Sequence, residues 1–139
     1  MVYVDSSVFV SLYTADAHVR VAKRIMAEHP SVFLTPLHEA ELTHALYQHV
    51  FRKELTSRQA DALYSQYEKD RESNIWVRAN IPESSFELAT SLARTHARKL
   101  GVRTLDTLHV ACALLLKADR FHTLDKRQLA LAKAEGLSN

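Results

Sequence analysis

Short apolar runs alternate with longer segments of helical periodicity along this chain. Three apolar runs are typical of β-strands, at residues 1–4, 32–34 and 120–124, and a weaker fourth lies at 75–77. Between these runs the apolar residues recur every three or four positions, which is the spacing of amphipathic helices. Together with capping signals, this spacing predicts helices over residues 6–13, 17–29, 36–52, 57–70, 84–100, 105–117 and 126–135.

Several of these boundaries carry local signals of their own. Pro30 closes the second helix because proline cannot continue one. Thr35 followed by Pro36 is a favourable helix start, with a capping hydroxyl and a proline at the first helical position. Short strands separated by helices imply a parallel sheet covered on both faces. We therefore expect an α/β sandwich, formed by a single domain over residues 1–139.

The composition favours an ordinary soluble globular protein, with 47% hydrophobic and 24% charged residues. The longest apolar run, VACALLL, is too short for a membrane span, which takes about 20 residues. No basic stretch followed by a long apolar region opens the chain, so we expect no secretion signal and no membrane association. The one cysteine, Cys112, is interpreted as a small core residue, and it permits neither an intramolecular disulfide nor a thiolate zinc site. A reducing, cytoplasmic setting is the matching expectation.

The charge pattern permits an acidic partner without demanding one. The formal net charge is +2, which is compatible with RNA. The nearest approach to a basic cluster is interpreted as a solvated helix face; it comprises Arg94, Arg98, Lys99 and Arg103.

Several enzyme classes are excluded by missing residues. Two glycines are too few and too far apart for a dinucleotide fingerprint or a P-loop. The stretch HEAELTHALYQH superficially suggests a zinc-protease helix, but Leu42 stands where that motif needs its second histidine. His38, His44 and His49 also spread around the helix instead of forming one ligand row. A haloacid-dehalogenase-like phosphatase needs an acid at the position of Ser7, and the acidic pair of a response-regulator receiver is missing.

Four acids form the candidate chemistry: Asp5, Glu41, Asp106 and Asp125. Asp5 and Asp125 follow predicted strands, at the sheet edge where α/β proteins bind ligands, and Asp106 heads the helix just before the last strand. Taken singly, Asp5, Asp106 and Asp125 could each cap a helix. Taken together, converging carboxylates would repel one another unless a cation offset their charge. An all-oxygen ligand set suits Mg²⁺ or Mn²⁺, the ions of phosphoryl chemistry.

Two positions stay open on periodicity alone. Glu41 lies on the same row of its helix as Leu37 and Ala45, so it can point toward the edge of the core. Helix periodicity does not exclude Glu39 as the site residue. His109 follows Asp106 by three residues and could approach the pocket, although a satisfied core histidine is the favoured interpretation.

At this point the sequence resembles the PIN domain family, and within it the VapC-type toxins of bacterial toxin–antitoxin pairs. The resemblance rests on four stretches in the family's order: YVDSSVFV, TPLHEAELTHAL, LDTLHVACAL and FHTLDKRQLALA. It covers essentially the whole chain, and the last two stretches at their spacing are the most specific. It implies a three-layer α/β/α sandwich with a short-stranded parallel sheet, and a metal-dependent endoribonuclease.

The resemblance also implies roles for individual residues. The family's four acids correspond to Asp5, Glu41 rather than Glu39, Asp106 and Asp125. Asp5, Asp106 and Asp125 are expected to hold Mg²⁺ or Mn²⁺, with Glu41 binding the metal or orienting the attacking water. Ser6 and Thr123 are expected to fix the carboxylates. The implied products carry a 3′-hydroxyl and a 5′-phosphate.

The implied partners are an RNA substrate, a small antitoxin protein that blocks the acidic pocket, and a second copy of the chain in a homodimer. The apolar surface of the helices at 36–52 and 57–70 is a candidate partner groove, although plain core packing explains it equally well. Two alternatives remain: a stand-alone PIN ribonuclease without an antitoxin, and a non-catalytic interaction module in which the acids serve only as caps.

Overall fold

A computed structural model describes all residues from 1 to 139, and its elements follow the predicted order closely. The four strands are β1 (Val2–Val4), β2 (Phe33–Leu34), β3 (Val77–Arg78) and β4 (Arg120–His122). The seven helices are α1 (Ser6–Thr14), α2 (Val19–Glu28), α3 (Pro36–Phe51), α4 (Ser57–Glu72), α5 (Ser85–Leu100), α6 (Thr104–Leu115) and α7 (Lys126–Ala134). None of the seven helices combines the length and the apolar character that crossing a bilayer requires.

The strands form a parallel arrangement with β1 near its centre. β1 pairs with β4, and β2 pairs with β3, both in parallel. A parallel bridge between Val2 and Val32 joins the two pairs, which gives the order β3–β2–β1–β4. The chain therefore leaves β1 for β2 on one side and later returns to β4 on the other. Such a reversal of strand order opens a crevice beside the carboxyl end of the central strand.

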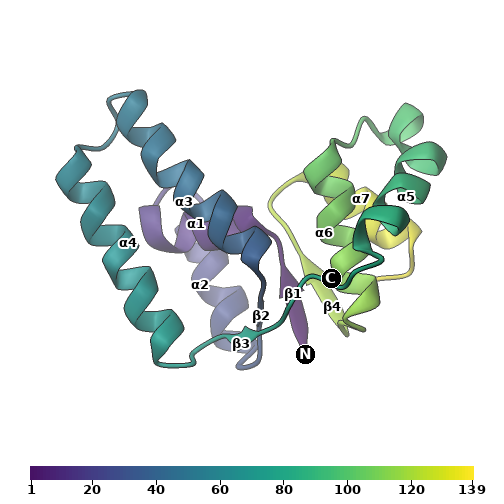
Figure 1. Cartoon of the computed structure of the whole chain (residues 1–139), viewed down its shortest axis with the longest axis horizontal. Coiled ribbons are helices and arrows are strands. Elements are labelled where there is room, and N and C mark those ends of the chain that lie inside the picture. Colours follow the sequence, from purple (N-terminus) through teal and green to yellow (C-terminus); the bar gives the residue numbers. More distant parts are fainter.

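Helices cover both faces of this sheet, which confirms the three-layer sandwich (Figure 1). Helices α1 to α4 pack on one face and α5 to α7 on the other. The side chains of β1 alternate accordingly, because successive residues of a strand point to opposite faces. Val2 and Val4 enter the core under α1–α4, whereas Tyr3 enters the core under α5–α7.

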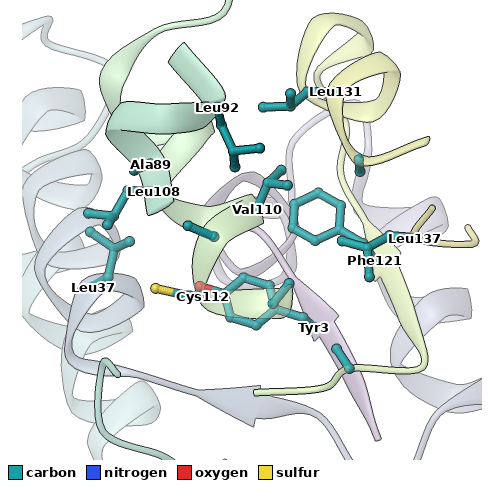
Figure 2. Close-up of a cluster of buried hydrophobic side chains, with 14 of the residues drawn as sticks. Tyr3, Leu37, Ala89, Leu92, Leu108, Val110, Cys112, Phe121, Leu131 and Leu137 are labelled. Atoms are coloured by element: carbon teal, nitrogen blue, oxygen red, sulfur yellow. The ribbon is translucent and has the colours of Figure 1, made fainter. Parts of the chain in front are cut away.

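The core under α5–α7 is built around α6, which is buried over most of its surface (Figure 2). Tyr3 stacks on Phe121 of the neighbouring strand with the two ring planes 8° apart, and both rings lie beneath this helix. Leu131 of α7 and Leu92 of α5 close the cluster from the outer layer. Cys112 lies in the same core, as expected from the sequence.

Some boundaries differ from the prediction by one or two residues. The fourth apolar run forms a strand at Val77–Arg78 rather than at 75–77, because Val77 is the residue in register with Phe33. β4 ends at His122, two residues earlier than predicted, and the chain then turns into the start of α7. Helix boundaries commonly vary by this amount, since local signals are weakest at the ends.

The α3–α4 hairpin buries most of its apolar surface in the core of the protein. Leu42, Leu46, Ala60 and Tyr67 are all buried there. Of the large apolar side chains on these two helices, Phe51 stands out, with 83% of its surface exposed. Core packing therefore accounts for these four side chains, and the candidate partner groove on the two helices stays a prediction.

Candidate active site

One pocket gathers all four predicted acids. Asp5, Glu41, Asp106 and Asp125 line a cavity of about 690 Å³ at the carboxyl ends of β1 and β4. Its walls come from α1 and α3 on one side and from α6 and α7 on the other. In Figure 1 these two groups of helices stand on either side of the strand ends. The acids are far apart in sequence, and the parallel pairing of β1 with β4 brings Asp5 and Asp125 to the same edge of the sheet.

Asp5 is buried, with 7% of its surface exposed. Its backbone N–H donates to the carbonyl of His122 on β4, at 2.9 Å. The hydroxyl of Ser7 donates to Asp5 Oδ1 at 2.5 Å, and Ser7 accepts in turn from the Leu124 N–H. Burial raises the pKa of Asp5, and the opposing effects of His109, Ser7 and Thr123 do not cancel that rise.

Glu41 is held by two donors on the same oxygen. Ser6 Oγ lies 2.6 Å and His109 Nε2 lies 2.5 Å from Glu41 Oε2. Burial alone would raise the pKa of this carboxyl, but His109 and Ser6 outweigh burial and hold it below its usual range. Glu39 instead pairs with Arg71 of α4, away from this pocket. The structure therefore places Glu41, and not Glu39, at the pocket, whereas helix periodicity could not choose between these two acids.

Asp106 and Asp125 cap helices and line the pocket at the same time. Asp106 Oδ2 accepts from the backbone N–H of Arg103 at 2.7 Å. Asp125 Oδ1 accepts from the N–H groups of Arg127 and Gln128 at 2.7 and 3.2 Å, as an N-cap does. Burial would raise the pKa of Asp125, but these N–H groups and the two nearby arginines lower it overall. The same two side chains thus make capping hydrogen bonds and line the pocket.

The predicted supporting hydroxyls divide their contacts in an unexpected way. Ser6 contacts Glu41, whereas Ser7, which the sequence did not single out for support, contacts Asp5. Thr123 Oγ1 accepts from the Asp125 N–H at 2.9 Å and also lowers the pKa of Asp5. Adjacent serines at the start of a helix point in different directions, so the spacing alone could not assign their partners.

The sequence also underrated two basic residues. His109 is buried as a core residue, yet its ring contacts Glu41 and lines the pocket. Arg103 was interpreted as part of a solvated helix face, but its guanidinium lies 3.4 Å from Asp106 and 3.6 Å from Asp125. The sequence signal for both was their position within three residues of Asp106.

The histidines of α3 do not form a metal site. His38 is fully buried, and its Nε2–H donates to the Val4 carbonyl at 2.7 Å. Its Nδ1 accepts from the Thr35 N–H, and burial lowers its pKa to about 3. His44 lines the acidic pocket, and His49 pairs with Glu54 at the far end of the helix. No group of three histidines, cysteines or acids stands ready to enclose an ion.

The donor set nevertheless fits a hydrated divalent cation. In Glu41 and Asp106 one carboxylate oxygen is anchored by hydrogen bonds, while the other, Glu41 Oε1 or Asp106 Oδ1, accepts none. Asp125 Oδ2 also accepts no hydrogen bond, but it lies 3.6 Å from the Arg103 guanidinium and 3.7 Å from that of Arg127. Buried Gln128, which also lines the pocket, has an unpaired Oε1. Mg²⁺ keeps several of its waters and takes only one or two carboxylates directly. A preformed three-ligand cage is therefore not required for these residues to bind it.

The sequence matches the model of the PIN domain family over residues 2–134. The chain belongs to the PIN domain family. No sequence among the curated proteins matches it. Its structure is similar to the crystal structure of Mycobacterium tuberculosis VapC20, a toxin that cleaves the sarcin–ricin loop. That likeness has a TM-score of 0.72 and covers 99% of this chain and 96% of VapC20, at 19% sequence identity.

At this identity the likeness shows a common fold. It confirms the PIN-type α/β/α architecture that the four sequence stretches implied.

Proposed function

We propose that this PIN domain is a divalent-metal-dependent endoribonuclease, and that it is the toxin of a toxin–antitoxin pair. The observation that carries the proposal is the convergence of Asp5, Glu41, Asp106 and Asp125 in one pocket. The fold shared with VapC20, a toxin that cleaves the sarcin–ricin loop, supports the same assignment.

In this proposal the chain positions a cation and a phosphodiester at the carboxyl ends of the strands. Asp5, Asp106 and Asp125 hold Mg²⁺ or Mn²⁺ directly or through water, and Glu41 binds the ion or orients the attacking water. When bound, the ion would supply water activation and charge neutralisation at the leaving oxygen. Arg103, at the mouth of the pocket with 69% of its side chain exposed, is available to contact a substrate phosphate.

The test uses purified protein and end-labelled RNA. We expect cleavage with Mn²⁺, none with EDTA, and none with Asp5→Asn. Equal cleavage in all three conditions would contradict the proposal, because neither the metal ion nor the Asp5 carboxylate would then be needed. The matched control is Glu39→Gln against Glu41→Gln, because both change one carboxylate of α3 but only Glu41 lines the pocket. Product ends should be a 3′-hydroxyl and a 5′-phosphate.

The same cleavage assay, repeated with different classes of RNA, tests the substrate. Since VapC20 cleaves the sarcin–ricin loop, ribosomal RNA is the first substrate to test, followed by transfer and messenger RNA. Mapping new 5′ ends in cellular RNA after expression identifies the target without prior choice.

The partner proposals need separate tests. A short neighbouring reading frame for a DNA-binding protein, whose co-expression restores growth, would support the antitoxin. Growth arrest that no neighbouring gene relieves would favour a stand-alone PIN ribonuclease. Light scattering of the pure chain tests the proposed homodimer. An intact fold whose thermal stability Mn²⁺ does not change, with no cleavage, would favour the non-catalytic interaction module.

A further inference from the structure

A buried hydrogen-bonded series connects the β1 core to the acidic pocket. Tyr3 Oη lies 2.8 Å from His109 Nδ1, and His109 Nε2 lies 2.5 Å from Glu41 Oε2. Ser6 Oγ donates to the same Glu41 oxygen and lies 3.2 Å from His109 Nε2. Tyr3 and His109 are 0% and 2% exposed, so water does not compete for these contacts.

The partners determine where the imidazole proton lies. A carboxylate only accepts hydrogen bonds, so His109 Nε2 must carry a hydrogen that it donates to Glu41. Burial raises the pKa of Tyr3 well above its usual value, so its hydroxyl keeps its proton and can donate to Nδ1. Nε2 therefore carries the hydrogen that faces Glu41, and Tyr3 Oη holds the opposite edge of the ring at Nδ1. The arrangement parallels metal sites in which an outer hydrogen bond orients the ligand.

The same contacts decide which Glu41 oxygen faces the pocket. Oε2 accepts from both Ser6 and His109, while Oε1 accepts from no protein group. A glutamate on a helix surface would otherwise rotate freely about its terminal bond. With Oε2 anchored, only Oε1 is presented to a ligand.

We propose that His109 is a positioning residue that, with Ser6, clamps Glu41 Oε2 so that Oε1 alone is offered to the divalent cation or its water. The inference rests on the proposed function, since it assumes that Glu41 serves a cation. It assigns a functional role to a histidine whose burial could also be explained by core packing alone. The competing account is that His109 only fills space beside Tyr3 and His38, whose rings lie 5.7 and 5.2 Å away.

Two substitutions of His109 separate these accounts. In His109→Gln the amide nitrogen reaches the position of Nε2 and can still donate to Glu41. In His109→Asn the amide nitrogen reaches only the position of Nδ1, so the Glu41 contact is lost. Both variants remove a buried ring, so loss of packing affects both. We expect His109→Asn to weaken Mn²⁺ binding by about 10- to 100-fold, the usual cost of losing an outer partner, and His109→Gln to stay within about threefold of the wild type.

The measurements are Mn²⁺ titration calorimetry and, on RNA, kcat and KM determined separately. We expect kcat to follow Mn²⁺ affinity while KM for RNA changes little. Equal Mn²⁺ affinity in the two variants would overturn the positioning role. A wild type that binds Mn²⁺ but cleaves no RNA would contradict the proposed function. The positioning role of His109 would still be tested, by the ratio of the Mn²⁺ affinities of His109→Asn and His109→Gln.

A measurement on the unaltered protein guards against variants that fail to fold. Nitrogen NMR shifts of His109 report its tautomer directly. We expect Nε2 to carry a hydrogen in the metal-free protein. An unprotonated Nε2 in the wild type would overturn the clamp.

Discussion

Replacing Asp5 by Asn should stabilise the metal-free protein while it abolishes the proposed cleavage. Asp5 is buried and its pKa is raised, so the folded protein holds the acid's proton more tightly than the unfolded chain does. An unfolded Asp titrates near pH 3.9. The contribution of Asp5 to the free energy of unfolding is therefore fully present below that pH. The wild type loses this contribution as the pH rises through the folded-state pKa of Asp5. Asn cannot ionise and avoids the loss.

The structure limits what else the substitution changes. Asn keeps an acceptor oxygen for the Ser7 hydroxyl, and Asp5 makes no side-chain cap bond at α1 that could be lost. An incompletely compensated buried charge costs about 1–3 kcal/mol. In a chain of this size each kcal/mol changes the melting temperature by about 3–4 °C. We expect Asp5→Asn to melt about 3–12 °C higher than the wild type at pH 7.5 in EDTA.

The assay is thermal unfolding followed by circular dichroism at pH 7.5 and at pH 4. The gap between variant and wild type should shrink at pH 4, and excess Mn²⁺ should stabilise the wild type selectively. Glu83→Gln is the control, because Glu83 is exposed and makes no ion pair, and it should change nothing. An Asp5→Asn variant that melts below the wild type at pH 7.5, or a gap independent of pH, would refute the reasoning.

Three further outcomes follow from particular side chains. Glu41→Gln should lower RNA cleavage by at least about 100-fold, whereas Glu39→Gln should keep it within about twofold in the same gel assay. Leu131→Ala removes a fully buried side chain and should lower the free energy of unfolding by about 2–5 kcal/mol in urea titration; a loss under 1 kcal/mol would contradict the described core. Cys112 is buried and burial raises its thiol pKa, so it should react with a thiol reagent only in denaturant; rapid reaction of the native protein would contradict its placement.

Much of the architecture was predictable because its causes are local. Apolar runs, helical spacing and the Thr35–Pro36 start act over a few residues, and the helices formed where they indicated. The positions of Asp5 and Asp125 near strand ends also followed from the pattern: Asp5 directly follows β1, and Asp125 lies three residues after β4. The family resemblance added the choice of Glu41.

The contacts within the site could not be read from the chain. His109 and Glu41 are 68 residues apart, and Ser6 and Glu41 are 35 apart, so no local spacing relates them. Whether Ser6 or Ser7 would hold Asp5 depended on how α1 is rotated against β4. The sequence by itself determined which elements form and which acids stand at their ends. Only the tertiary structure decided which oxygens are anchored and which face the pocket, because those choices depend on packing between distant segments.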